Sequence, residues 1–518
     1  MNPQKSSKSF DSVSQPPYKV NLRAFYNCNN EALIRIEVSD DATTKHVPSS
    51  VFLVIDVSGS MAAAASTYYD SDGKSGLSQL DMVKHASRTI IESLGEQDKL
   101  AVIAFASYAN TVYRLAPMTS GNRAEAWKAV EALLPTSSTN LYGGLMKALK
   151  LVKKQNTMPS NPNIMLLTDG MPNFSPPRGE LESLRNFLDA NPRLSQVRIS
   201  TFGFGYNVNS QLLADIARVG RSIYAFIPDA SFVGTVFVNA VSNILATATT
   251  SQLTLKLEAT KDVKLTGISS GQDSHKTEWG LQVELPSLLY GQTLEILVQT
   301  SGDPSKEPFQ AFLDSDRSSE PLEASPVHVN PVDVEHSFFA QVKVRSEILN
   351  CIRNAGRCNS EKELNQAQTF VAIARQRVAV IAENNYTLDI CKMKQDLDGQ
   401  VKEAYSRLDW HKRWGIHYIL SLASAHSLQQ CTNFKDMGLE TYITKKFFLI
   451  RSSCERKFVD LPPPKPSRQV RKSIKSMSAF YSSSAPCFAS GQVRMSDGSQ
   501  TSITDIKAGD CLDRKSVV

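Results

Sequence analysis

The feature that most constrains the fold is an alternation of short apolar runs with helical stretches, from about residue 48 to residue 247. The apolar runs are SVFLVID, KLAVIAF, NIMLLTD, VRISTFGFG and SIYAFIP. They are apolar throughout, as strands are when helices cover both faces of a parallel sheet. Segments such as LSQLDMVKHASRTIIESL, with apolar residues three and four apart, separate them. The pattern predicts a doubly wound α/β domain over residues 48–248.

The segments that flank this domain have the alternation of strands without helices. After residue 250 the runs SQLTLKLEA, KTEWGLQVELP and QTLEILVQT follow one another, separated by Gly, Pro and Ser. They predict an antiparallel β-sandwich over residues 249–335. The upstream segment ALIRIEVSD, within residues 20–47, has the same alternation. We expect it to supply the first strands of the sandwich, which makes the α/β domain an insertion.

The remaining segments differ in composition from the two β-containing parts. Residues 336–460 return to a helical period and predict a small helical domain. Residues 461–486 are rich in Pro, Ser and basic residues, which is typical of a solvated linker. Residues 487–518 form a short final segment, and the polar residues 1–19 are predicted to be a disordered leader.

Composition and charge exclude several classes of function. A net charge of +6 over 518 residues is too small to indicate nucleic-acid binding. The 8 cysteines include no CxxC pair, which fits a reducing compartment and disfavours a zinc ribbon. No apolar stretch is long enough to span a membrane, and the N-terminus has no secretory signal. These observations predict a cytoplasmic protein.

The segment DVSGSM, residues 56–61, is the first candidate site because it directly follows the run VFLVI. Open α/β sheets bind ligands at the carboxyl ends of their strands. A nucleophile elbow requires G-x-S-x-G and a P-loop requires G-x-x-x-x-G-K-[ST], and neither frame is present. An aspartyl phosphotransferase would need a carboxylate at position 58, which is serine. A metal site needs only small oxygen ligands on neighbouring loops.

Two further loops supply such ligands. The segment TSSTNLYGG offers Thr139, and LLTDG ends a strand with Asp169. Mg²⁺ prefers six oxygen ligands, so the hydroxyls of Ser58, Ser60 and Thr139 together with Asp56 and Asp169 suit Mg²⁺ or Mn²⁺. Soft ligands are missing, which disfavours zinc. The alternative is that these residues only form turns and helix caps.

The segments DVSGSM, STN and LLTDG resemble the metal-ion-dependent adhesion site of von Willebrand factor A-type domains, whose pattern is D-x-S-x-S, then Thr, then Asp. The resemblance implies that Ser58, Ser60 and Thr139 bind the ion directly. Asp56 and Asp169 would act directly or through water. Neutral hydroxyl ligands leave the ion much of its charge, so an Asp or Glu carboxylate of a protein partner can complete its coordination. The resemblance therefore implies cation-dependent protein binding, of adhesion or scaffold type, and not an enzyme.

The end of the chain carries a second resemblance. The segment CFASGQVRMSDGSQTSITDIKAGDCL is similar to the opening block of Hint domains, the fold of inteins and hedgehog autoprocessing segments. The resemblance implies that Cys487 is the nucleophile of an acyl shift at the Pro486 carbonyl. No histidine follows Cys487, so we expect a truncated and inactive Hint domain. A coincidental β-hairpin remains the other interpretation of this segment.

Together the segments resemble eukaryotic proteins that combine an A domain, a β-sandwich, a helical intein-associated region and a Hint domain. Some plant relatives carry a RING finger before the A domain, but the N-terminal region here has only Cys28 and no zinc-ligand spacing. The alternative function is a self-processing precursor. A metal-dependent phosphohydrolase is less favoured because no paired carboxylates or general base accompany the ion site. We also expect Asp56 and Asp169 to lie at exposed strand ends, so that alanine there removes ion binding without affecting the fold.

Overall fold

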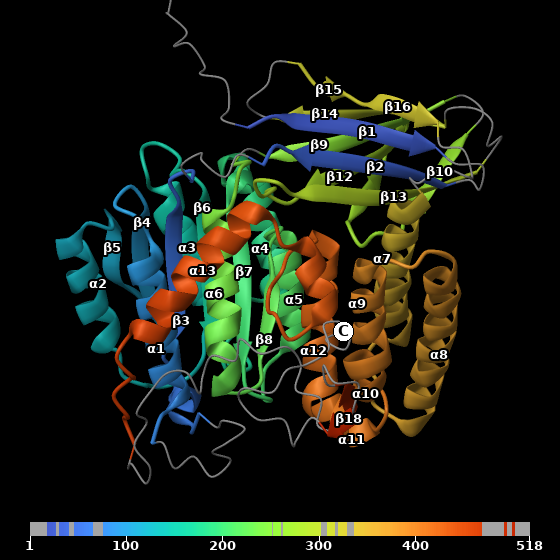
Figure 1. The fold of residues 1–518 in the computed structure, drawn as a ribbon. Coiled ribbons are helices and arrows are strands. Elements are labelled where there is room, and N and C mark those ends of the chain that lie inside the picture. Colours follow the sequence, from blue (N-terminus) through green and yellow to red (C-terminus); the bar gives the residue numbers. More distant parts are fainter. Residues whose placement is uncertain are drawn as a thin grey trace, which may run out of the picture.

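The computed structural model describes residues 18–26, 31–40, 46–65, 76–250, 252–260, 263–301, 308–315, 320–328, 336–468, 492–494 and 500–502. Its α/β unit contains a six-stranded sheet in the order β5-β4-β3-β6-β7-β8, in which only the edge strand β5 is antiparallel to its neighbour (Figure 1). The strands are β3 (Ser50–Asp56), β4 (Lys99–Phe105), β5 (Ala109–Pro117), β6 (Pro162–Thr168), β7 (Arg198–Phe204) and β8 (Tyr224–Ile227). The predicted doubly wound α/β fold is confirmed.

Helices cover both faces of this sheet because its central strands are apolar on both sides. Alternate residues of β3 belong to different cores: Leu53 and Ile55 pack with one set of helices, and Phe52 and Val54 with the other. The first set is α1 (Gln79–Ser93), α2 (Ser120–Glu131) and α6 (Val233–Leu245); the second is α3 (Leu141–Lys153), α4 (Gly179–Asp189) and α5 (Ser210–Val219). Short 3₁₀ turns connect them: η1 (Gly59–Ala62), η2 (Pro192–Gln196) and η3 (Ala230–Phe232).

A β-sandwich of two five-stranded sheets lies beside the α/β unit (Figure 1). Strand β2 pairs antiparallel with both β1 and β13, so strands that precede the α/β unit in sequence pair with one that follows it. The α/β unit is therefore an insertion within the sandwich, as predicted. One sheet contains β10 (Lys264–Ile268), β13 (Thr293–Ser301), β2 (Glu31–Val38), β1 (Val20–Tyr26) and β16 (Ser325–His328); the other contains β11 (Ser274–Lys276), β12 (Gly280–Leu285), β9 (Leu253–Ala259), β14 (Phe309–Ser315) and β15 (Leu322–Glu323).

The C-terminal helices share a hydrophobic core, as expected of the predicted small helical domain, and two of them also pack on the α/β unit. Helix α12 packs against β8 and α5, and α13 lies across α6 and α1 (Figure 1). A helical period shows that a face is apolar but not which surface it covers, which is why the sequence alone missed this packing. The helices are α7 (His336–Ala355), α8 (Glu361–Asn384), α9 (Leu388–Asp396), α10 (Lys402–Ala404), α11 (Leu408–Trp410), α12 (Ile416–Leu428) and α13 (Lys445–Asp460), with π-helical η4 (Leu397–Val401) and η5 (His411–Gly415) and 3₁₀-helical η6 (Met437–Tyr442).

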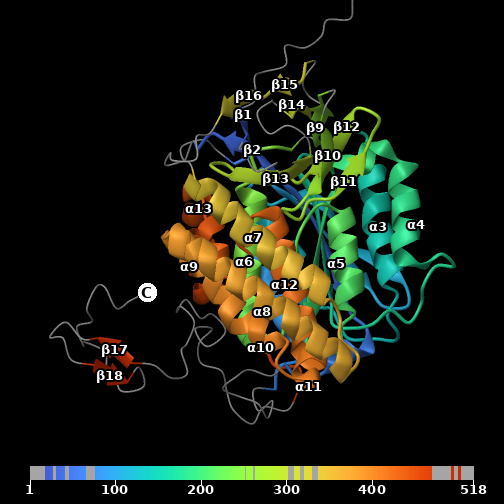
Figure 2. The same ribbon diagram turned by 90° about the vertical axis from the view of Figure 1, so that its right-hand side faces the viewer.

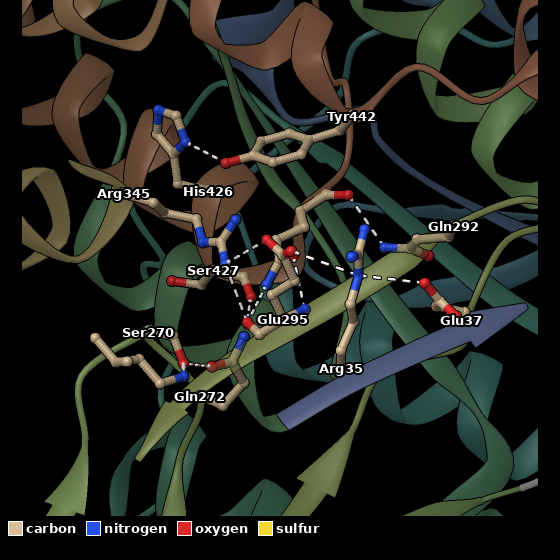
Figure 3. A network of polar contacts seen from close by, with 12 residues as sticks. Arg35, Glu37, Ser270, Gln272, Gln292, Glu295, Arg345, His426, Ser427 and Tyr442 are labelled. Carbon is tan, nitrogen blue, oxygen red and sulfur yellow. Dashed lines mark hydrogen bonds and ion pairs between the residues drawn. The ribbon is translucent and has the colours of Figure 1, made fainter. Parts of the chain in front are cut away.

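A polar network joins the sandwich to the helices (Figure 3). Arg345 of α7 donates a hydrogen bond of 3.1 Å to the backbone carbonyl of Glu295 in β13, and its guanidinium lies 3.6 Å from the Glu295 carboxylate. Gln429, directly after α12, accepts from the Glu295 N–H at 3.0 Å and donates to its carbonyl at 2.7 Å. Arg345 and Gln429 are each 1% exposed, so this network fixes the sandwich on the helices in a buried setting.

The stretch predicted to be a solvated linker is partly bound to the α/β unit. The Lys465 ammonium lies 2.8 Å from the carboxylate of Glu131 in α2, and the Ser467 hydroxyl donates a 2.6 Å hydrogen bond to Asp81 in α1. Farther along, β17 (Gln492–Arg494) pairs with β18 (Gln500–Ser502). Cys487 lies outside the described residues, so its role stays a prediction. Among the described helices, none combines the length and apolar composition needed to cross a bilayer.

We expect the stability of the fold to depend on pH through His85, which lies at the contact between α1 and α13. His85 is 1% exposed, and its ring meets that of Phe458 edge-on at 5.0 Å. Burial, with a contribution from Arg88, lowers the pKa of His85 to about 4. The unfolded chain binds this proton near pH 6.5 and the folded chain does not, so stability is present above pH 6.5 and falls as the pH drops toward 4. We expect His85→Gln to reduce that loss by on the order of 1 to 3 kcal/mol.

Melting temperatures measured between pH 7 and pH 4 test this expectation. His275→Gln is the matched control, because His275 is exposed on β11 and should leave the pH dependence unchanged. Equal pH profiles for the wild type and His85→Gln would contradict it.

Candidate metal-ion site

The five residues predicted to hold a metal ion come from three loops at one edge of the α/β sheet. Asp56 is the last residue of β3, and Asp169 directly follows β6. These strands are parallel neighbours, with Ile55 paired to Leu167, so their carboxyl ends meet at the same edge. Ser58 and Ser60 lie at the start of η1, directly after β3, and Thr139 precedes α3.

Hydrogen bonds connect the two carboxylates to the two serines. The Ser58 backbone N–H donates to the Asp56 carboxylate at 2.7 Å, and the Ser60 hydroxyl donates to the Asp169 carboxylate at 2.8 Å. The two serine hydroxyl oxygens are 3.1 Å apart. Four of the predicted residues therefore lie in one connected cluster.

Thr139 lies beside the same cluster. A Cβ atom built on Gly170 would lie 3.5 Å from the Thr139 hydroxyl oxygen and 3.6 Å from that of Ser60. Both hydroxyls therefore face the backbone of Gly170, next to Asp169. The absence of a side chain at Gly170 leaves this side of the cluster free.

Three further residues, which no sequence pattern indicates, support the cluster. The Thr168 hydroxyl donates to the Asp56 carboxylate at 2.6 Å. Asn173 accepts from the Thr139 N–H through its side chain and donates its own N–H to the Thr139 carbonyl, both at 2.8 Å. The Ser137 carbonyl accepts from the Gly59 N–H at 2.9 Å, which ties the second loop to the first. Because these contacts join loops that are distant in sequence, no local pattern indicates them.

The two carboxylates are buried, which corrects the expectation that they lie at exposed strand ends. Asp56 is 0% exposed and Asp169 is 5% exposed, whereas Ser60 is open to solvent. Burial raises the pKa of Asp56, and burial with the nearby Asp56 charge raises the pKa of Asp169 to about 6 against the opposing Ser60 hydrogen bond. Asp56→Ala would also leave the buried Ser58 N–H and Thr168 hydroxyl without their hydrogen-bond acceptor, so we expect it to destabilise the fold.

The donor set fits a hard divalent cation. Neither carboxylate forms an ion pair with a described Lys, Arg or His side chain, and buried charges are costly unless a counter-charge accompanies them. In the part of the chain that the structure describes, no three His, Cys, Asp or Glu residues are grouped so that they could hold a metal. The cluster thus depends on hydroxyl oxygens beside two carboxylates, which suits Mg²⁺ or Mn²⁺ and not zinc.

The histidines of the C-terminal helices form core contacts. His411 accepts a 3.1 Å hydrogen bond from the Cys358 N–H, His417 lies 2.6 Å from the Ser210 hydroxyl, and His426 lies 2.8 Å from the Tyr442 hydroxyl. Each of the three is buried. His417 therefore links α12 to α5 of the α/β unit, whereas His411 and His426 form contacts within the C-terminal helical region.

Known proteins resemble this chain in two separate regions. The family model of the von Willebrand factor type A domain matches residues 51–171, and a model described as VWA / Hh protein intein-like matches residues 389–456. These regions cover the α/β sheet from β3 to the Asp169 loop and the helices from α9 to α13.

Two relatives are similar to part of this chain in sequence. The human inter-alpha-trypsin inhibitor heavy chain H3 is 29% identical over 179 residues, 33% of this chain and 18% of that protein. The E3 ubiquitin-protein ligase WAV3 of Arabidopsis thaliana is 29% identical over 133 residues, 26% of this chain and 16% of that protein. The chain thus spans about a fifth or less of the length of either relative.

A solved structure extends the similarity of fold over most of the chain. It is titled von Willebrand factor type A from Catenulispora acidiphila, has 16% sequence identity and a TM-score of 0.58, and covers 80% of this chain and 98% of its own. The chain therefore carries a von Willebrand factor type A domain as its α/β unit and a VWA / Hh protein intein-like region in its C-terminal helices.

Proposed function

We propose that this chain binds proteins through a divalent cation held by Asp56, Ser58, Ser60, Thr139 and Asp169. The observation that carries the proposal is the cluster itself: three hydroxyls meet two buried carboxylates that have no cationic partner among the described residues. Von Willebrand factor A domains commonly mediate protein–protein interaction or adhesion, which agrees with this assignment.

The chemistry of the ligands explains how such a site recognises a partner. A bound Mg²⁺ or Mn²⁺ supplies a positively charged position that accepts a carboxylate oxygen. Asp56 and Asp169 provide the negative charge that holds the cation, and the neutral hydroxyls of Ser58, Ser60 and Thr139 add ligands without adding charge. Ser60 opens to solvent, so an Asp or Glu side chain of a partner has access from that side.

Binding, and not catalysis, is the activity that these residues support. The carboxylates and hydroxyls of the cluster are the ligand types of a hard cation, and a bound cation would occupy them as ligands. The similarity to a ubiquitin ligase covers 16% of that protein, so we do not extend its activity to this chain. Autoprocessing at Cys487 lies outside the described residues, and no observation favours it.

Chelation should release the partner. A peptide library displayed on phage and panned on the immobilised chain in Mg²⁺ should yield peptides that carry Asp or Glu and that excess EDTA elutes at matched ionic strength. A selected peptide should lose binding when its acidic residue is changed to the amide. Peptides that stay bound in EDTA, or that tolerate the amide, would overturn the proposal.

A further inference from the structure

A groove lies between the edge strand β5 and helix α3, apart from the five residues of the ion site. It has a volume of about 550 Å³. Its lining includes Asn110, Arg114 and Leu115 from β5, and Lys147, Leu151 and Gln155 from α3 and the residues just after it. Lys147, Leu151 and Gln155 are four residues apart, so successive turns of one helix face line the groove. Figure 2 shows α3 beside α4 on the side of the α/β unit away from α7 and α8.

The charge of this surface has one sign. Arg114 and Lys147 are exposed, as are Lys150 of α3 and Lys154, which directly follows that helix. No Asp or Glu occurs within β5 or anywhere in residues 141–168. Within the described ranges, none of these four cations forms an ion pair. An acidic ligand would meet attraction along the whole groove and no repulsion from its lining.

The backbone beside the groove belongs to the edge of a sheet. Strand β5 ends the order β5-β4-β3-β6-β7-β8 and pairs only with β4 in the described sheet. An edge strand presents N–H and C=O groups on which an extended peptide can form a further strand. Basic side chains at an edge also prevent unwanted pairing, but here they border a groove that contains Leu115 and Leu151. Leu115 and Leu151 give the methylene groups of acidic side chains apolar contacts in addition to the charge attraction.

We propose that this groove binds an acidic peptide segment in extended conformation, as a strand added to β5. Side chains alternate along a strand, so every second residue of the peptide faces the groove. Acidic residues at these positions reach Arg114 and Lys147, and the intervening residues point away. The interaction requires no metal ion and is therefore separate from the cation-dependent binding proposed above.

A fluorescein-labelled peptide of alternating Glu and Val tests the proposal by anisotropy, with the whole chain and excess EDTA present. The double variant R114E/K147E should weaken binding by at least about tenfold, since each reversal replaces an attraction by a repulsion. The matched control K362E/K412E changes the net charge equally at exposed positions on α8 and η5, and should stay within about twofold of the wild type. An equal loss in both variants would overturn the proposal.

The backbone pairing of the peptide with β5 is tested with the same peptide methylated on alternate amide nitrogens. Two versions are compared, each of which blocks the N–H groups along one edge of the peptide strand. One version should bind as the parent does, and the other should bind at least about tenfold more weakly, because an added strand pairs through one edge only. Equal binding of both versions would overturn strand addition.

Tighter binding of an oligouridine or of phosphatidylserine vesicles, lost in R114E/K147E, would assign the groove to RNA or membrane instead. Because EDTA is present throughout, failure here leaves the ion-site proposal intact.

Discussion

Replacing Asp169 by asparagine should abolish Mg²⁺ binding while the fold remains. Asparagine keeps an oxygen that accepts the Ser60 hydrogen bond but removes the negative charge that the cation requires. Residues that only support metal ligands typically contribute 10- to 100-fold to affinity, so losing a ligand charge should weaken Mg²⁺ binding by at least about 100-fold. Calorimetric titration measures the loss directly.

The fold of this variant should be at least as stable as that of the metal-free wild type. Burial and the Asp56 charge raise the pKa of Asp169 to about 6, so its ionised form is held at a cost when no cation is present. Mg²⁺ should raise the melting temperature of the wild type by mass action and leave that of Asp169→Asn unchanged. Asp189→Asn, at the exposed end of α4, is the matched control and should bind Mg²⁺ normally. If Asp169→Asn bound Mg²⁺ as tightly as the wild type does, Asp169 would not be a ligand of the cation.

Arg345→Ala should destabilise the protein by about 3 to 5 kcal/mol, the cost of breaking a buried ion pair by removing one partner. Arg345 is 1% exposed and lies against the Glu295 carboxylate, which is also buried (Figure 3). Burial raises the pKa of Glu295, and the guanidinium groups of Arg345 and Arg35 oppose this shift. Without Arg345 the carboxylate keeps only Arg35, at 3.7 Å. Urea unfolding measures the change.

Two further variants show whether charge is the cause. Adding Glu295→Gln to Arg345→Ala should recover more than half of the loss, because no buried carboxylate then remains. Arg353→Ala, on the same helix but exposed, should stay within about 0.5 kcal/mol of the wild type. A loss in Arg345→Ala no larger than that in Arg353→Ala would show that this network does not hold the sandwich on the helices.

The separation of the metal-site residues in sequence explains why their supporting contacts were missed. Asp56, Ser58 and Ser60 form a local pattern, and Thr139 and Asp169 follow at loops that the strand pattern places at the same edge. Asn173 and Thr168 show no such pattern, because their roles depend on hydrogen bonds to residues 34 and 112 positions away. Burial of the carboxylates was missed for the same reason, since the loops that cover them are separate in sequence.

The sequence by itself indicated the helices and five of the six strands of the α/β unit, and it missed the edge strand β5. Uniformly apolar strands indicated a sheet covered on both faces, and alternating strands indicated a sandwich with one half-buried face per sheet. Both patterns are local consequences of which side chains a strand presents to each face. The insertion of the α/β unit also followed, because the first strands alternate in the same manner as those after residue 250.

Only the tertiary structure decided which surfaces these elements share. Helices α12 and α13 contribute Ile419 and Phe447 to the core of the helical region, and they also cover the α/β unit, where Phe458 is 0% exposed. Likewise, Arg114 and Lys147 lie beside an open sheet edge because β5 is the last strand in the order of the sheet. The hydrophobic effect is non-directional, so an apolar face in the sequence shows only that some other surface must cover it. The three-dimensional arrangement of the elements determines which surface that is.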